Sequence, residues 1–68
     1  MNESLKVNGT EHPMPETATI SGLLSTLGLD GKPVVVEHNK TALFPRDYES
    51  ATLRDGDAVE VITIAAGG

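Results

Sequence analysis

The residues at the end of the sequence are those whose types and spacing could do chemistry. A run of β-branched residues leads into Ala65, Ala66, Gly67 and Gly68, so the side chains shrink to methyl groups and then to hydrogen. Four extended residues span about 13–14 Å, and glycine has no Cβ to obstruct a narrow channel. Such a tail could carry the terminal carboxylate of Gly68 into the active site of another protein. The alternative is a frayed terminus without a function, because two glycines alone are weak evidence.

Metal chemistry is disfavoured by the ligands available. The sequence has no cysteine, which removes thiolate metal sites, disulfides and a cysteine nucleophile. His12 and His38 stand far apart in different expected strands, so they lack the spacing of zinc or iron ligands. We expect two surface histidines and no metal site.

Catalytic groups are equally scarce. Ser21 and Ser25 fall in an expected helix, without the glycine-flanked turn that exposes a serine nucleophile. The glycines do not reproduce the spacing of a phosphate-binding loop. Four acidic residues occupy turns or exposed strand positions, where a solvated face explains them: Glu37, Asp55, Asp57 and Glu60. We therefore predict no catalytic residue and a protein that is not an enzyme.

Length and charge restrict the partners. Sixty-eight residues suffice for one small domain. Ten acidic and five basic residues give a net charge of −5, which argues against nucleic acid and anionic membranes, since both require Lys or Arg. The first residues lack the features of a signal peptide, and no stretch approaches the roughly 20 apolar residues of a membrane span. We expect a cytoplasmic protein.

The first elements that position the tail form a predicted β-hairpin. Residues 4–8 alternate between polar and apolar, Asn8-Gly9 can adopt the positive φ angles of a two-residue turn, and residues 10–12 can return. Pro13 cannot donate to a sheet ladder, so the second strand should end nearby or lie at an edge.

One amphipathic helix is expected next. Four apolar residues share one stripe at i, i+3, i+4 and i+7: Ile20, Leu23, Leu24 and Leu27. Thr19 is the expected N-cap, and Gly28 followed by Leu29 fits a left-handed C-terminal cap. Gly22 inside the helix costs up to about 1 kcal/mol relative to alanine, so the start of the helix is less well defined.

Three more strands are expected after the helix. Residues 34–36 are β-branched and precede a turn at Asn39-Lys40, and residues 41–43 offer a short return strand. Residues 45–51 predict a loop or a short helical turn. The last strand, residues 58–64, follows a strong turn signal at residues 55–57. A mixed β-sheet packed on one α-helix, an α+β fold, accommodates this order.

The alternation of the strands separates a core from an outer face. The expected core residues are Leu5, Val7, Ile20, Leu23, Leu24, Leu27, Val34, Val36, Leu53, Val59 and Val61, with Tyr48 as a further plug. If Val59 and Val61 face the helix, then Glu60, Ile62 and Ile64 lie on the opposite face beside the tail. Exposed β-branched residues there suggest a partner-binding patch, unless a loop covers them or strand twist buries one.

The ordered set of motifs resembles the ThiS family of sulfur carrier proteins over essentially the whole chain. The segments that carry the resemblance are the hairpin around Asn8-Gly9, LLSTLGL, VVVEHNK, FPRDY, LRDGDAVEV and the terminal Ala-Gly-Gly. The resemblance implies a ubiquitin-like β-grasp domain over residues 1–64 and a flexible tail over residues 65–68. Gly22 departs from the family pattern, in which stronger helix formers usually fill the helix.

The resemblance also implies a reaction cycle and its partners. An adenylating enzyme of the ubiquitin-activating type would use ATP to adenylate Gly68, whose carboxylate is an anion at neutral pH. A sulfur donor such as a cysteine desulfurase would convert the adenylate to a thiocarboxylate, and thiazole synthase would take the sulfur for thiamin biosynthesis. The carrier itself would hold no cofactor stably.

Several alternatives stay open at the level of the sequence. The small subunit of molybdopterin synthase shares the fold and the Gly-Gly end but is usually longer, and carriers for tRNA thiolation are related. A module that only binds a partner through its sheet, with an inert tail, belongs to a different class. Sulfur acquisition at the terminus would distinguish a carrier from such a module.

Overall fold

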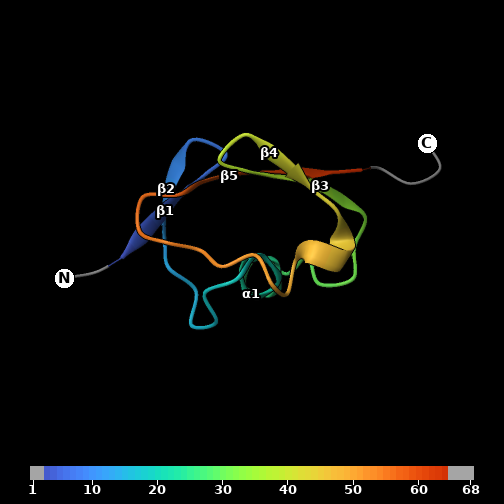
Figure 1. The fold of residues 1–68 in the computed structure, drawn as a ribbon, viewed down its shortest axis with the longest axis horizontal. Helices are drawn as coiled ribbons and strands as arrows, with labels where there is room; N and C mark the ends of the chain where they lie inside the picture. Colours follow the sequence, from blue (N-terminus) through green and yellow to red (C-terminus); the bar gives the residue numbers. More distant parts are fainter. Residues whose placement is uncertain (1–2, 65–68) are drawn as a thin grey trace.

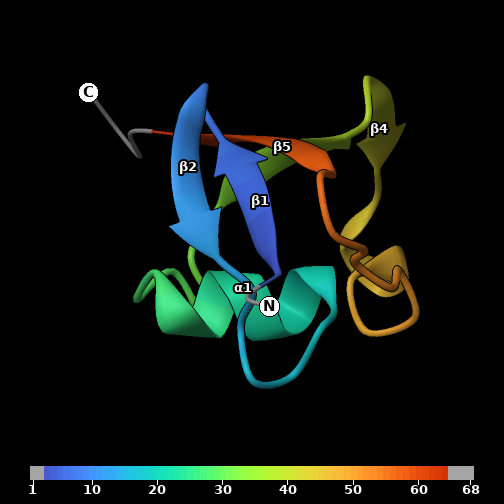
Figure 2. The same ribbon diagram turned by 90° about the vertical axis from the view of Figure 1, so that its left-hand side faces the viewer.

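The architecture is a five-stranded mixed sheet with one helix on one of its faces (Figures 1 and 2). A computed structural model describes residues 3–64. Its elements are β1 (Ser4–Val7), β2 (Thr10–Pro13), α1 (Ile20–Thr26), β3 (Val34–His38), β4 (Thr41–Leu43), the 3₁₀ turn η1 (Pro45–Asp47) and β5 (Ala58–Thr63). The order in the sheet is β2-β1-β5-β3-β4. Only β1 and β5 run parallel, which confirms the predicted α+β, β-grasp arrangement.

Both hairpins turn where the sequence indicated. Asn8 and Gly9 have φ angles of 51° and 81°, as the two-residue turn between β1 and β2 requires. The second turn, between β3 and β4, uses Asn39 and Lys40 at φ angles of 50° and 70°. Strand β2 ends at Pro13 and lies at the edge of the sheet, where a residue without an N–H group is tolerated.

Helix α1 has the predicted cap at each end. The Gly22 N–H group donates to Oγ1 of Thr19 over 3.0 Å. At the other end Gly28, with φ of 74°, donates to the carbonyl of Ser25, and Leu29 donates to that of Leu24. This pair of hydrogen bonds is the Schellman motif, in which a left-handed glycine satisfies the last carbonyl groups of a helix.

The core lies between α1 and the inner face of the sheet. Nine of the eleven predicted core residues are buried: Leu5, Val7, Ile20, Leu23, Leu24, Val36, Leu53, Val59 and Val61. Leu27 and Val34 are only partly buried and pack against this cluster, because they lie at the ends of their elements. Tyr48 also packs against the cluster from the segment that follows η1.

Candidate functional site

The tail predicted to carry the chemistry, Ala65, Ala66, Gly67 and Gly68, lies outside the described residues. The structure instead shows what precedes it. Strand β5 is the central strand of the sheet, with β1 on one side and β3 on the other. It runs on toward the C-terminus as the last element of the chain (Figure 1). The surroundings of β5 therefore form the base from which the tail is presented.

The exposed large apolar residues among positions 3–64 gather around this base. They are Val35, Phe44, Ile62 and Ile64, which are 44%, 62%, 59% and 50% exposed, and we call them the outer-face patch. Val35 and Ile62 are cross-strand partners on the face that α1 does not cover. Because Leu43 pairs with the buried Val36, the next residue, Phe44, falls on the same side as Val35.

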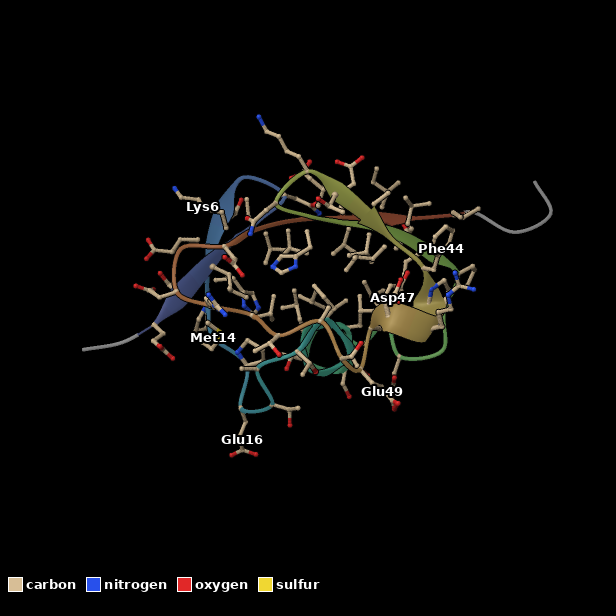
Figure 3. The ribbon with its side chains drawn as sticks, in the orientation of Figure 1. Lys6, Met14, Glu16, Phe44, Asp47 and Glu49 are labelled. Atoms are coloured by element: carbon tan, nitrogen blue, oxygen red, sulfur yellow. The ribbon has the colours of Figure 1, made fainter. Side chains whose placement is uncertain are left out.

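Phe44 also has a basic neighbour. The guanidinium carbon of Arg46 lies 5.0 Å from the centroid of the Phe44 ring, within the range of a cation–π contact. Figure 3 shows Phe44 toward the end of the molecule at which β5 finishes. The patch thus combines apolar side chains with one guanidinium group.

The exposure of Ile62 confirms the alternation predicted for β5 as far as this residue. Ile64, just beyond the end of the strand, is half exposed and also lines a cavity with Leu24 and Tyr48, so its outward position stays a prediction. Val59 and Val61 are buried against α1, whereas Glu60 is exposed on the opposite face. Among residues 3–64 neither a covering loop nor the twist of the strand buries either isoleucine, so both of these alternatives are wrong. The role of Glu60, Ile62 and Ile64 in binding a partner stays a prediction.

Two members of the patch were missed from the sequence. The alternation that places Val34 and Val36 on the inner face already implies that Val35 faces outward. Phe44 carried a weaker signal, because the return strand before it is only three residues long. Its position becomes clear only from the register between β3 and β4.

A pair of carboxylates lies beside the patch. Glu60 and Glu37 are directly opposite each other on β5 and β3, and both are exposed. Within residues 3–64 neither takes part in a salt bridge. Their opposed positions place two negative charges close together on this face, although such like-charged pairs repel each other.

Two asparagines in left-handed turns hold β5 from both sides. Asn8 donates its backbone N–H to the carbonyl of Val59 over 2.9 Å. Its side-chain amide donates to the carbonyl of Val61 over 3.1 Å and accepts from the Val61 N–H group over 2.8 Å. On the other side, Asn39 exchanges hydrogen bonds with both backbone groups of Ala58. The two asparagine side chains thus form hydrogen bonds with the backbone of β5 at positions where β1 and β3 no longer pair with it.

The start of β5 is fixed by the half-buried carboxylate of Asp57. Oδ2 of Asp57 accepts from Nε2 of His38 over 2.7 Å and from the N–H group of Arg54, and Oδ1 accepts from the side chain of Asn39. Burial by itself would raise the pKa of Asp57, but the hydrogen bonds from His38, Arg54 and Asn39 hold the pKa below its ordinary value of 3.8.

The histidines do not come together. His12 belongs to β2 and His38 to β3, and β1 and β5 lie between these strands. Nδ1 of His12 lies 2.7 Å from the carbonyl oxygen of Pro13. Over residues 3–64 no group of three or more His, Cys, Asp or Glu side chains could hold a metal ion. In the same span no helix is long and apolar enough to cross a bilayer.

Comparisons with known proteins give a consistent set of similarities. Residues 2–68 match the model of the ThiS family. The sulfur carrier proteins ThiS of Bacillus subtilis and Thermus thermophilus are 34% and 36% identical to the chain, over 94% and 91% of it and 98% and 95% of their own lengths. The crystal structure of the thiamine biosynthesis protein ThiS from Geobacter metallireducens is 34% identical, covers both chains fully and has a TM-score of 0.76.

A larger relative is also similar to this chain. The thiazole synthase of Paramagnetospirillum magneticum is 33% identical over 94% of the chain. The chain spans only 20% of the length of that protein. The similarity is therefore to one segment of a longer polypeptide.

Proposed function

The chain belongs to the ThiS family, and on that premise we propose that it carries sulfur as a thiocarboxylate at Gly68. It is a sulfur carrier protein of thiamin biosynthesis. The observation that supports the thiocarboxylate is the family match through residue 68, which includes Gly67 and Gly68 after the last strand. In this proposal the carrier supplies a folded domain that its partners bind and a tail that reacts, and the partners supply the catalytic groups.

The proposed cycle has two steps at one carbon atom. In the first, the carboxylate of Gly68 attacks the α-phosphate of ATP, pyrophosphate leaves, and an acyl adenylate forms. In the second, the outer sulfur of a persulfide on the donor attacks the carbonyl carbon and expels AMP, so a C–S bond forms and a C–O bond breaks. A thiol then attacks the donor's sulfur and breaks the S–S bond, which leaves the thiocarboxylate on the carrier and a disulfide on the donor. Because the carboxylate is ionised at neutral pH, it needs no base to become a nucleophile.

Three partners follow from this cycle. An adenylating enzyme of the ubiquitin-activating type carries out the first step, and a cysteine desulfurase is the proposed sulfur donor. Thiazole synthase is the proposed acceptor, and the thiazole synthase of Paramagnetospirillum magneticum that contains a similar segment supports this assignment. The cytoplasmic location expected from the sequence is part of the same proposal.

The division of labour within the chain is also proposed. In the proposal, partners bind the domain formed by residues 1–64, and residues 65–68 form a flexible tail that enters the active sites of these partners. The outer-face patch is the proposed contact surface, because Ile62 and Ile64 lie shortly before the tail and are 59% and 50% exposed. Exposed apolar residues grouped at one place commonly mark a protein contact.

The test is a mass measurement on the intact protein. The carrier is incubated with the adenylating enzyme, ATP and a sulfur donor, and we expect the mass increase that accompanies replacement of one oxygen by sulfur. Omission of ATP is the control and should abolish the increase. A protein that bound the adenylating enzyme but never acquired sulfur would be an interaction module, and the proposal would be wrong.

A further inference from the structure

The last part of β5 has a neighbouring strand on one side only. Strand β1 pairs with β5 at just two positions, Lys6 with Ala58 and Val7 with Val59, and then turns away at Asn8. Strand β3 continues farther along β5, to the pairing of Val34 with Thr63. Figure 1 shows β5 running past β1 toward the C-terminus while β3 still accompanies it.

The hydrogen bonds of β5 show which backbone groups face the open side. Both backbone groups of Val61 bond to the side chain of Asn8, on the β1 side. The N–H group of Ile64 instead donates to the carbonyl of Pro33, on the β3 side. Because backbone groups alternate along a strand, the N–H and C=O groups of Thr63 point to the side that β1 has left.

Thr63 is therefore where β5 becomes an open edge. It is exposed, and within residues 3–64 its backbone groups have no hydrogen-bond partner on the β1 side. The amide of Asn8 closes the edge as far as Val61 and no farther. The open edge thus begins two residues before the tail and at the margin of the outer-face patch.

We propose that the backbone edge at Thr63 docks an extended segment of the adenylating enzyme, which pairs with β5 as an added strand. The inference rests on the proposed function. The chemistry of the tail supports it, because Ala65 to Gly68 have only methyl groups and hydrogens as side chains. Apart from the terminal carboxylate, a protein that recognises such a tail can use only its backbone, and strand addition is a recognition mode that does so. In an extended bound tail, Ala65 and Gly67 would present the same edge as Thr63.

A second copy of this chain is a poorer occupant of the same edge. Two copies would share only the few hydrogen bonds that one open position offers, and each has a net charge of −5. Like net charges oppose association of identical chains. The carboxylates of Glu37 and Glu60 beside the patch favour a partner with basic residues around its docking strand.

The test removes one N–H group and leaves the β3 ladder intact. Thr63→Pro deletes the donor on the open side, where proline is tolerated in an edge position. Thr63→Val replaces only the hydroxyl group with a methyl group, keeps the backbone N–H group, and is the matched control. We expect Thr63→Pro to weaken binding of the full-length carrier to its adenylating enzyme roughly tenfold, as for loss of one hydrogen bond, and Thr63→Val to change it less than about twofold.

Amide exchange on the wild-type protein gives a second readout in case the proline variant does not fold. We expect the Thr63 amide to exchange quickly in the free carrier and slowly in the complex, with Ile62 protected in both. Equal binding of folded Thr63→Pro and wild type, or an unchanged Thr63 exchange rate in the complex, would overturn the inference. Protection of Thr63 in the concentrated free protein would identify a second copy as the occupant and also overturn it.

The two proposals can fail separately. If the wild-type carrier acquires sulfur normally and Thr63→Pro binds equally well, only the docking strand is wrong. If the wild-type carrier is never adenylated by its enzyme, the proposed function fails and this inference fails with it.

Discussion

The backbone carbonyl oxygen of Thr17 occupies the space that a β-carbon on Gly22 would need. This oxygen is held in place by the N–H group of Thr19, which donates to it over 2.8 Å. Thr19 in turn caps α1 through its side chain. The segment before the helix therefore crosses directly over Gly22, and this position requires glycine although it lies inside a helix.

We expect Gly22→Ala to destabilise the protein. Alanine has the better helix propensity by up to about 1 kcal/mol, but the overlap with Thr17 should cost about 1–3 kcal/mol or more. Urea unfolding measures the difference. Ser25→Ala, at an exposed position of the same helix, is the control and should be neutral or slightly stabilising. A Gly22→Ala variant more stable than wild type would show that the crossing segment moves aside easily.

Acid should weaken the contacts at Asp57. Because the pKa of Asp57 is lower in the folded protein than its ordinary value of 3.8, its contribution to stability is complete above that value and is lost as the pH falls through the folded pKa. Asp57→Asn should reduce the free energy of unfolding at pH 7 by about 1–3 kcal/mol and flatten the acid limb of the stability profile.

Urea unfolding between pH 7 and pH 2 checks this expectation. Asp30→Asn, at an exposed carboxylate, is the matched control and should keep the wild-type profile. If Asp57→Asn retained the same acid sensitivity as wild type, another carboxylate would have to account for it.

Ile62→Ser should impair adenylation more than folding. The side chain is 59% exposed, so its loss should change the free energy of unfolding by less than about 1 kcal/mol. The apparent affinity for the adenylating enzyme should fall, because an exposed apolar contact is removed. Val61→Ala, one residue away but buried, should do the opposite and lower stability by roughly 2 kcal/mol. If the Ile62→Ser variant were adenylated normally, the surface that binds the adenylating enzyme would have to lie elsewhere than the outer-face patch.

The terminus should tolerate neither extension nor bulk. Addition of one alanine after Gly68 moves the carboxylate away from the position that the adenylating enzyme recognises, and Gly67→Val places a branched side chain in a narrow channel. Both proteins should melt at the wild-type temperature and fail to acquire sulfur in the intact-mass assay. Normal sulfur acquisition by the extended protein, without removal of the added residue, would count against Gly68 as the site.

Much of the fold could be predicted because its signals are local. The turn at Asn8-Gly9, the stripe from Ile20 to Leu27 and the cap at Gly28 each depend on residues within a few positions of one another. The inner and outer faces of β5 follow from alternation alone. The same alternation placed Ile62 on the exposed face, shortly before the predicted tail.

The remaining features depend on contacts between distant segments. Nothing near Gly22 in the sequence indicates that the chain folds back over it, so only the propensity cost of this glycine was apparent. The amide of Asn8 meets Val61 across the sheet, and His38 meets Asp57 in the same way. The open edge at Thr63 requires both the strand order and the length of β1, neither of which has a local pattern.

The central place of β5 has a consequence for synthesis. During translation β5 is the last of these strands to leave the ribosome, yet it lies between β1 and β3, which are made earlier and do not pair with each other. Strands β1 and β3 therefore cannot join one sheet until β5 has been synthesised, and pairings between segments so distant in the sequence slow folding. A nascent chain interrupted before β5 would lack the core residues Val59 and Val61 as well as the tail. The segment that completes the sheet thus also leads directly into the tail, so a chain interrupted before it would lack both a closed core and the proposed site of the chemistry.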